Sequence, residues 1–524
     1  MRHFSFLILV IASGLFVRAQ SPNILLIIAD DLGVDALNGY NLGSINPTTP
    51  HLDSLRNNGL TFTNVWSSPV CSPTRAGIMS GKYGIKNGVK TVPGDLDTAH
   101  ISILNSVKDT NSNYTTAIIG KWHIAKLNDL FHPIWHGADH FMGIMGAGCS
   151  TAYDDWDKTE NGITVNVTDY ATRYFTNDAI SWINNQNQPW ILWLSHAAPH
   201  GPLHVPPSYM HSQPSTNSQM KKYMAMIESL DYEVGRLLDP LSASEKASTT
   251  IIFIGDNGTP NNLLQDYPSD RGKGTLYQGG IHVPMFVSGH GVTRVGETEN
   301  ALVNVIDIYA TMMELAGASL AGGMYNSLSF KHLLTGSSSP KRRYNYTEID
   351  TNNMGEHIQG YAIRDSIYKL IEYYDGQQEM YDLVSDTMEL SDLLLGSLTS
   401  QQQSIKADLE SEAAQIQAAW SCNDDIKNGD EDGIDCGGTY CTPCNTISIK
   451  HKKSNRDLSV FPNPVGNYFT IDPDGKLIQE IKIFNVLGEL LLSKEINNSS
   501  ATTIDISYLE SSVYFLHVKL IEET

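Results

Sequence analysis

The stretch SPNILLIIAD, residues 21–30, is the first strong structural signal in the chain. It is a continuous apolar run that follows a proline and ends at Asp30, and Asp31 comes directly after it. A strand that is apolar on both faces is typical of the buried centre of a parallel sheet. The stretch therefore predicts a central strand whose carboxyl end carries two adjacent carboxylates.

Similar apolar runs recur along the chain, with amphipathic helical patterns between them. The runs are residues 115–119, 190–195, 250–255 and 283–288, and the helical patterns include residues 219–238 and 304–316. Strands that alternate with helices predict a doubly wound α/β sheet, covered by helices on both faces. In such sheets, ligands bind beyond the carboxyl ends of the strands.

Acidic and amide side chains stand where two of these strands are expected to end. Asp30 and Asp31 follow the first run, and Asp256 and Asn257 follow a later one. Burial of adjacent carboxylates requires a cation or basic partners, although an aspartate at such a place can also be an ordinary helix cap. Oxygen ligands from two strand ends fit Ca²⁺, with Mg²⁺ as the alternative.

Basic side chains gather in the same loops, although the chain as a whole is acidic. Its formal net charge is −22, which argues against nucleic acid or an anionic membrane as a partner. The basic candidates at this edge of the sheet are Arg75, Lys121, His123, His196, His200 and Lys273. Each of them taken singly could be an ordinary loop residue. Together they predict a pocket for a tetrahedral oxyanion, sulfate or phosphate.

These motifs resemble those of formylglycine-dependent sulfatases, which have an alkaline-phosphatase-like fold, over roughly residues 23–394. The resemblance is carried by Asp30 and Asp31, CSPTR at 71–75 followed by Gly77, GKWH at 120–123, PH at 199–200, DNG at 256–258 and GKGTLYQGG at 272–280. It implies that a maturation enzyme converts Cys71 to formylglycine. From the residues alone, a disulfide between Cys71 and Cys149 is the alternative.

The resemblance also implies a role for each candidate residue. One calcium ion would be held by Asp30, Asp31, Asp256, Asn257 and modified Cys71. The catalytic residues would be Cys71 as nucleophile, Arg75 beside it, Lys121 and Lys273 on the sulfate oxygens, His200 as proton donor to the leaving alcohol and His123 as base. His196 would contact the substrate or the residues behind the site.

Two positions depart from the family pattern, and four aromatic residues follow the nucleophile. The chain has Gln278 where the family commonly has glutamate, and His282 where it often has arginine; neither belongs to the metal or sulfate residues of the pattern. The aromatic residues Trp122, Trp135, Tyr153 and Trp156 are expected either to stack on sugar rings or to pack in the core.

Residues 1–19 have the features of a signal peptide: a basic start, an apolar run over residues 4–16 and a Val-Arg-Ala ending. The run is too short to span a bilayer, and no later segment has a continuous apolar run of membrane length. We therefore expect a secreted or cell-surface protein without a membrane span.

Composition and residue pattern divide the remaining chain into four parts. Residues 20–335 would form the sulfatase catalytic domain, and residues 336–420 a smaller α+β subdomain with a closing helix. Residues 421–450 would be a linker rich in aspartate and cysteine, whose four cysteines are expected to form disulfides, with zinc as the alternative. Its aspartates are also candidates for a structural calcium site.

Residues 451–524 read as short strands with turn signals, which predict a small β-sandwich. The stretches FPNPVGNYFTID, IKIFNVLGELL and SSVYFLHVK within them resemble the C-terminal sorting domains of the type IX secretion system of Bacteroidota. The resemblance implies that the type IX secretion machinery is a partner of the chain. An ordinary accessory β-domain is the alternative.

The sequence as a whole is interpreted as that of a secreted sulfatase. Its substrate would be a sulfated carbohydrate, with algal galactans, ulvan or fucose polymers ahead of animal glycosaminoglycans. One alternative is a phosphate or phosphonate ester hydrolase of the same superfamily. Another is a non-catalytic glycan-binding protein in which Cys71 stays unconverted.

Overall fold

The structure is a computed structural model. It describes residues 21–149, 151–214, 217–320, 324–336, 342–350 and 359–418, and in the C-terminal part residues 459–461, 468–472, 477–484, 490–499, 502–507, 509 and 514–521. The expected signal peptide (1–19) and the cysteine-rich linker (421–450) lie outside the described residues. Internal contacts divide the chain into two units, residues 1–429 and 430–524.

The first unit is built on one large mixed sheet with the strand order β10-β2-β9-β8-β1-β7-β3-β4-β5-β6. The strands are β1 (Asn23–Ala29), β2 (Gly59–Trp66), β3 (Thr115–Lys121), β4 (His140–Ile144), β5 (Trp156–Glu160), β6 (Ile163–Val167), β7 (Trp190–Ser195), β8 (Thr249–Gly255), β9 (Met285–Gly289) and β10 (Glu297–Asn304). The run 21–30 thus forms the strand β1, which pairs in parallel with both β7 and β8.

The strands β8, β1, β7, β3 and β4 form the continuous parallel part of the sheet. The run 283–288 forms β9, which is antiparallel to both of its neighbours, β2 and β8. At the other edge, β5 and β6 are also antiparallel. The predicted α/β fold class is confirmed, and the chemistry-bearing strand ends all belong to the parallel part.

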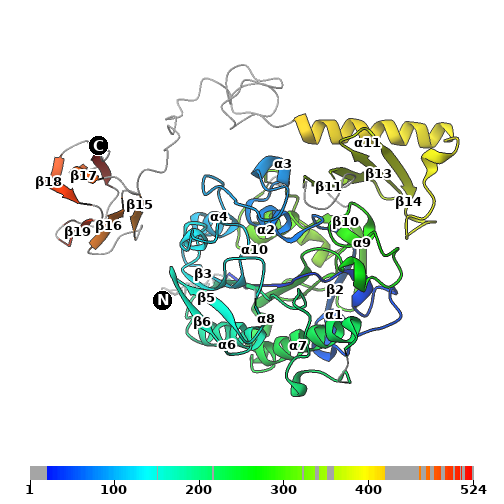
Figure 1. Cartoon of the computed structure of the whole chain (residues 1–524), viewed down its shortest axis with the longest axis horizontal. Coiled ribbons are helices and arrows are strands. Elements are labelled where there is room, and N and C mark those ends of the chain that lie inside the picture. Colours follow the sequence, from blue (N-terminus) through cyan, green and yellow to red (C-terminus); the bar gives the residue numbers. More distant parts are fainter. Residues whose placement is uncertain are drawn as a thin grey trace, which may run out of the picture. The chain divides into compact units, whose positions relative to one another are not determined.

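Helices cover both faces of this sheet. They are α1 (Pro50–Asn57), α2 (Cys71–Ser80), α3 (Gly84–Asn87), α4 (Ile103–Thr110), α5 (His132–Trp135), α6 (Ala171–Asn184), α7 (Gln219–Leu238), α8 (Ala243–Ala247), α9 (Gln278–Ile281) and α10 (Asp307–Leu315). Figure 1 shows α2, α4 and α10 on one side of the sheet, and α6 and α7 on the other. None of the helices in the described part of the chain combines the length and the apolar character that crossing a bilayer needs.

The core consists of two apolar layers, one on each side of β1. Ile24, Leu26 and Ile28 pack in the layer that contains α2, α4 and α10, whereas Leu25 and Ile27 pack in the layer that contains α6 and α7. Because successive side chains of a strand point to opposite faces, a strand between two helical layers has to be apolar throughout. This explains why the run 21–30 does not alternate with polar residues.

A smaller antiparallel sheet completes the first unit. Its strands, in spatial order, are β11 (Asn345–Ile349), β12 (Gly360–Arg364), β13 (Tyr368–Tyr373) and β14 (Gln378–Asp382). Helix α11 (Ser400–Ala418) packs across β12 and β13, and Figure 1 shows it beside the smaller sheet near β13. A third apolar cluster joins Trp66, Leu276 and Ile281 to residues of this sheet, so the small sheet is anchored beside residues 271–281.

The C-terminal unit contains two three-stranded sheets around one apolar cluster. The sheets are β15 (Ser459–Phe461), β16 (Tyr468–Asp472) and β19 (Thr502–Asp505), and β18 (Leu490–Ser499), β17 (Leu477–Phe484) and β20 (Phe515–Ile521). Phe469, Ile481 and Ile504 are members of the shared cluster. Two sheets on one core confirm the predicted β-sandwich.

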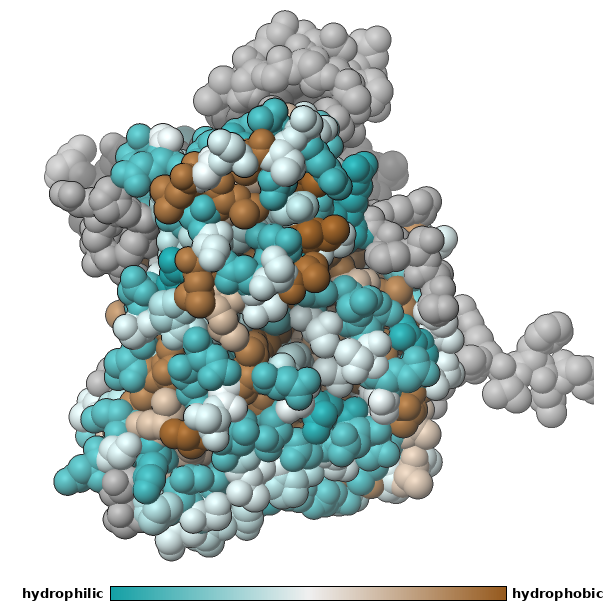
Figure 2. Space-filling model, turned by 90° about the vertical axis from the view of Figure 1, so that its right-hand side faces the viewer, coloured by the Kyte–Doolittle hydropathy of each residue, from teal (hydrophilic) through white to brown (hydrophobic). Residues whose placement is uncertain are grey.

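The surface of the face shown in Figure 2 mixes residue types. Hydrophobic residues form small separate areas among hydrophilic ones in that view. Scattered apolar residues are normal on a face exposed to water.

Candidate active site

The parallel strands bring the predicted acidic residues together. Ala29 pairs with Gly255 across β1 and β8, so the residues that follow these strands emerge side by side. The backbone N–H of Asp31 donates to Oδ1 of Asp256 over 3.0 Å. Asp30, Asp256 and Asn257 are fully buried, and Asp31 is 3% exposed.

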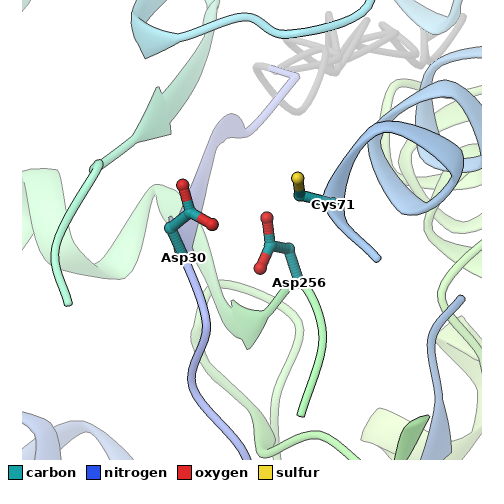
Figure 3. A group of neighbouring side chains, drawn as sticks. All are labelled: Asp30, Cys71 and Asp256. Atoms are coloured by element: carbon teal, nitrogen blue, oxygen red, sulfur yellow. The ribbon is translucent and has the colours of Figure 1, made fainter. Parts of the chain in front are cut away.

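Cys71 is the first residue of α2 and faces the same acidic cluster. Its thiol and the carboxylates of Asp30 and Asp256 offer atoms that all lie within 4.8 Å of one another. Figure 3 shows the three side chains turned toward one another. Only 2% of Cys71 is exposed. Cys71 and Cys149 are both free thiols, so the alternative of a disulfide between them is wrong.

Two buried oxygens of this cluster accept no hydrogen bond from any residue that the structure describes. They are Oδ1 of Asp30 and Oδ1 of Asn257. The amide group of Asn257 is held on its other side, because Nδ2 donates to Oδ1 of Asp31 over 2.9 Å. Buried oxygens without a partner are costly, and a hard divalent cation is the partner that such an oxygen-rich set prefers. The residues present therefore fit a calcium ion.

Arg75 is held beside the acidic cluster by several hydrogen bonds. Its Nε and Nη2 donate to Oδ2 of Asp256 over 3.1 and 2.8 Å, and Nη1 donates to the carbonyl of Lys121 over 2.8 Å and to Oγ of Ser195. The side chain is fully buried. Burial acts to lower the pKa of Arg75, but Asp256 and Asp30 outweigh it and raise the pKa. Arg75 thus serves as a fixed counter-charge.

Two lysines pair with the two adjacent aspartates. Lys121 Nζ lies 2.5 Å from Oδ2 of Asp30, and Lys273 Nζ lies 2.5 Å from Oδ1 of Asp31. Burial alone would raise the pKa of Asp31, but Lys273, His200 and Lys121 together hold it below its usual value. At Asp256, burial and the neighbouring Asp30 raise the pKa to about 6.

His123 touches the candidate nucleophile. Its Nδ1 lies 3.2 Å from Sγ of Cys71, and its backbone has a left-handed φ of 59°. The hydroxyl of Ser72 donates to the carbonyl of His123 over 2.7 Å and holds this bend in place. Burial, followed by the charges of Lys121 and Arg75, lowers the pKa of His123, so the ring is neutral at neutral pH.

His200 and Lys273 mark the side of the site that faces solvent. Their side chains are 23% and 18% exposed, whereas Cys71, Lys121 and His123 are buried. His200 Nδ1 donates to the carbonyl of Gly201 over 2.8 Å, and Nε2 lies 3.9 Å from Oδ2 of Asp31. Burial lowers the pKa of His200 to about 4, and Lys121 and Lys273 act in the same direction.

His196 lies behind the site. Its ring is fully buried, and neither nitrogen of the ring has a hydrogen-bond partner in the described structure. The centroid of the His196 ring lies 6.2 Å from that of the Phe175 ring. Burial lowers the pKa of His196 to about 3. This placement disfavours direct contact with a substrate and favours a supporting role.

Three of the four aromatic candidates for sugar stacking belong to the core. Trp122, Tyr153 and Trp156 are at most 2% exposed. The indole N–H of Trp122 donates to Nδ1 of His132, and that of Trp156 donates to the carbonyl of Asp169. The hydroxyl of Tyr153 donates to the carbonyl of Ala197. The stacking prediction is wrong for these three residues. Trp135 is 41% exposed.

The two departures from the family pattern fill local packing positions. Gln278 Oε1 accepts from the indole N–H of Trp66 over 2.8 Å, and His282 Nε2 donates to the carbonyl of Thr63 over 2.7 Å. Both contacts lie between β2 and the chain around α9. They involve none of the acidic or basic residues of the site.

The structure adds supporting residues that the sequence did not reveal. The hydroxyl of Tyr223, on α7, donates to the carbonyl of Asp31 over 2.6 Å, and Ser195 holds Arg75. Ser195 ends a predicted strand, which is a weak signal for a role at the site. Tyr223 lies inside an ordinary amphipathic helix, and nothing in the local sequence distinguishes it.

Comparison with family models gives three matches. The model described as Sulfatase matches residues 22–318, which is more than half of the chain. The model described as N-sulphoglucosamine sulphohydrolase, C-terminal, matches residues 271–419. The model described as Secretion system C-terminal sorting domain matches residues 459–524, which indicates export.

Known proteins with similar sequences or structures agree with these matches. N-acetylgalactosamine-6-sulfatase of Homo sapiens is 27% identical over 334 residues, which span 57% of this chain but only 62% of the human protein, less than two thirds of its length. Arylsulfatase G of Rattus norvegicus is 28% identical over 384 residues, 62% of this chain and 71% of the rat protein. The crystal structure of Ps i-CgsB is 25% identical, with a TM-score of 0.64, and the match covers 76% of this chain and 93% of that one.

Proposed function

The chain belongs to the sulfatase family, and we propose that it is a secreted enzyme that hydrolyses sulfate esters of a sulfated algal polysaccharide or its oligosaccharides. One observation carries the proposal. The thiol of Cys71, the group that is lost when cysteine is converted to formylglycine, lies within 4.8 Å of two buried carboxylates and 3.2 Å from a ring nitrogen of His123.

Asp30, Asp31, Asp256 and Asn257 would hold one calcium ion, with residue 71 as a further ligand. The unpaired oxygens of Asp30 and Asn257 support this assignment. When bound, the ion supplies positive charge that polarises a sulfate group and favours an ionised nucleophile. The three aspartates face three cations, Arg75, Lys121 and Lys273. A divalent ion would therefore leave a net positive centre, which suits an anionic ester.

The environment of Cys71 supports its conversion by a formylglycine-generating maturation enzyme. Burial raises the pKa of the thiol, even though Lys121 and Lys273 act against this. A thiol that stays protonated is a poor nucleophile, so an unmodified Cys71 would contribute little to catalysis. Formylglycine would supply a hydroxyl of its hydrated aldehyde as the nucleophile for sulfur.

The other residues have positions that suit binding and proton transfer. The ammonium groups of Lys121 and Lys273 each pair with one of the two adjacent aspartates and would bind the sulfate oxygens. Neutral His123 would accept a proton from residue 71 through Nδ1. His200 would donate a proton to the leaving alcohol from Nε2, because Nδ1 is engaged with Gly201. The negative charge of a bound sulfate would offset the lysines that depress the pKa of His200.

Export and the relatives guide the choice of substrate. The sorting-domain match indicates secretion or display at the cell surface, and the expected signal peptide would start that route, with the type IX secretion machinery as partner. A polymer outside the cell is the natural substrate of an exported hydrolase. The Ps i-CgsB protein has been crystallised with k-i-k-neocarrahexaose, and the human relative is named for a sulfated amino sugar. Both types of substrate therefore belong in a test panel.

The test is a hydrolysis panel on protein produced together with a maturation enzyme. 4-Nitrophenyl sulfate, sulfated galactan, ulvan and fucan oligosaccharides and sulfated glycosaminoglycan fragments are compared with a phosphate ester and a phosphonate ester. We expect sulfate release from at least one algal oligosaccharide and none from Cys71→Ala. Faster hydrolysis of the phosphate or phosphonate ester would contradict the proposal. Glycan binding without any turnover would favour a binding protein.

A further inference from the structure

Lys273 is carried by a loop, residues 271–277, that is held firmly on the side of the large sheet. The backbone N–H of Gly272 donates to the side chain of Asn261 over 2.7 Å. The N–H groups of Lys273 and Gly274 donate to backbone carbonyls of neighbouring loops over 2.9 and 2.8 Å. The middle of the loop thus has hydrogen-bond partners in the catalytic part, whereas the flanks of the loop have a further partner on another segment.

One residue that follows the last strand of the smaller sheet contacts both flanks of this loop. Glu389 follows β14 in the chain and is fully buried. Its Oε2 accepts from the backbone N–H of Gln278 over 2.6 Å, and its carbonyl oxygen accepts from the guanidinium of Arg271. Glu389 therefore connects Arg271, the first residue of the loop, with Gln278, the residue that directly follows the loop.

Glu389 is itself held by a buried ion pair. Its Oε1 lies 2.5 Å from Nζ of Lys369, a residue of β13, and both side chains are 0% exposed. The ammonium of Lys369 also lies 5.2 Å from the ring centroid of Trp66, and the guanidinium of Arg271 lies 4.3 Å from that of Tyr277. Lys369 thus reaches from the smaller sheet to Trp66 of β2, and the two ends of the loop contact each other through Arg271 and Tyr277.

This arrangement is energetically expensive. Glu389 has a left-handed φ of 58°, a backbone conformation that is unfavourable for residues other than glycine. A buried ion pair carries a desolvation penalty that its own attraction often fails to repay. In keeping with this, burial lowers the pKa of Lys369 to about 8, although Glu389 acts to raise it. Glu389 thus carries both backbone strain and a desolvation cost, although none of its described contacts is to the candidate nucleophile or the acidic cluster.

We propose that Glu389, held by Lys369, is a positioning residue through which the smaller sheet fixes the loop that carries Lys273, so that the ammonium of Lys273 stays in place to bind the oxyanion. The inference rests on the oxyanion-binding role proposed above for Lys273. It gives the smaller sheet a direct part in substrate binding, because Glu389 contacts both flanks of the loop through its side chain and its carbonyl. Tyr277, the last residue of the loop, adds a second contact by donating to the carboxylate of Glu379 on β14.

The test is a double-mutant cycle between Glu389→Gln and Lys273→Ala, read by the dissociation constant of inorganic sulfate in calorimetry and by KM and kcat for 4-nitrophenyl sulfate. Glu389→Gln removes the charge that pairs with Lys369 and that accepts from the backbone N–H of Gln278. We therefore expect it to weaken sulfate binding by about tenfold or more when Lys273 is present. In the Lys273→Ala background, the same change should alter sulfate binding by less than about twofold.

A matched control separates positioning from a general loss of stability. Asp307 and Arg342 form another buried ion pair, with side chains 2% and 7% exposed, which holds the start of α10. Asp307→Asn should lower the melting temperature in the same way as Glu389→Gln but leave KM and the sulfate dissociation constant unchanged. Glu389→Asp keeps the charge with a shorter reach and serves as a second variant; it should weaken sulfate binding in the same direction.

The outcomes distinguish the inference from the proposed function. Equal weakening of sulfate binding in both backgrounds, or none in either Glu389 variant, would overturn the positioning role while leaving sulfatase activity intact. Absence of any sulfate ester hydrolysis by the parent protein would instead overturn the proposed function, and the calorimetric cycle would still report on the loop. A KM shift in Asp307→Asn as large as that in Glu389→Gln would also count against positioning.

Discussion

Removal of calcium should lower the melting temperature of the first unit by several degrees. A chelator would leave Oδ1 of Asp30 and Oδ1 of Asn257 as buried acceptors without a partner. Each such group costs about 1–3 kcal/mol, so the ion should stabilise the fold by about 2–6 kcal/mol. The first unit spans 429 residues, and an unfolding entropy of about 2.1 cal/mol/K per residue gives about 0.9 kcal/mol/K. The expected shift is therefore about 2–7 °C.

Differential scanning calorimetry in EGTA and in millimolar CaCl₂ measures this shift directly. Asn257→Leu removes one of the two oxygens at similar volume and should reduce the calcium-dependent shift by about half or more. Asn345 is a control, because it is a fully buried asparagine whose Oδ1 also has no partner among the described residues, but it lies on β11. Asn345→Leu should keep the full calcium-dependent shift.

Two results would refute this reasoning. A melting temperature that does not change between EGTA and calcium would mean that the unpaired oxygens do not bind the ion. A calcium-dependent shift that survives in Asn257→Leu but disappears in Asn345→Leu would place the ion elsewhere. A titration with Mg²⁺ in the same instrument decides between the two ions that the ligand set allows.

The remaining predictions concern the nucleophile, the buried arginine and the pH dependence of stability. Cys71→Ala should abolish sulfate ester hydrolysis and change the melting temperature by less than about 2 °C, since the change removes only one small buried atom; a variant that precipitates or melts much earlier would contradict the assignment. Ser195→Ala removes one acceptor of Arg75 and should lower the unfolding free energy by about 1–3 kcal/mol in urea titrations, while an unchanged midpoint would argue that Arg75 is held without Ser195. Burial raises the pKa of Glu348 from its ordinary value of 4.5 to about 7. The stability that protonated Glu348 adds to the fold is therefore fully present below pH 4.5 and is lost as the pH rises through 7. The parent protein should lose up to about 3 kcal/mol of stability over that window relative to Glu348→Gln, and parallel stability curves for the two proteins would disprove this.

Much of the site is predictable from sequence, because its residues stand at places with a clear local signal. Asp30 and Asp256 follow apolar runs that become β1 and β8, and the parallel pairing of these strands places the two carboxylates together. Cys71 carries a recognisable local motif, and it opens α2 beside the same strand ends. For these residues, chain position and strand topology decide the location of the side chain.

Other features depend on tertiary packing and have no local signal. Trp122 and Trp135 look alike in sequence, yet one is buried against His132 and the other is 41% exposed. The strands β10 and β6 contain many exposed polar or apolar positions and lack the continuous apolar run that marks β1. Tyr223 and Glu389 reach the site region from 192 and 111 residues away in the chain, so only the folded structure reveals their contacts.

Peptide mass spectrometry at residue 71, combined with an activity assay on the same preparation, tests the central claim most directly. Preparations made with and without a maturation enzyme would provide different fractions of formylglycine. We predict that the rate of sulfate ester hydrolysis rises in proportion to that fraction and reaches zero when every Cys71 thiol takes up an alkylating reagent. Full activity in a preparation that contains only unmodified cysteine at this position would contradict the account.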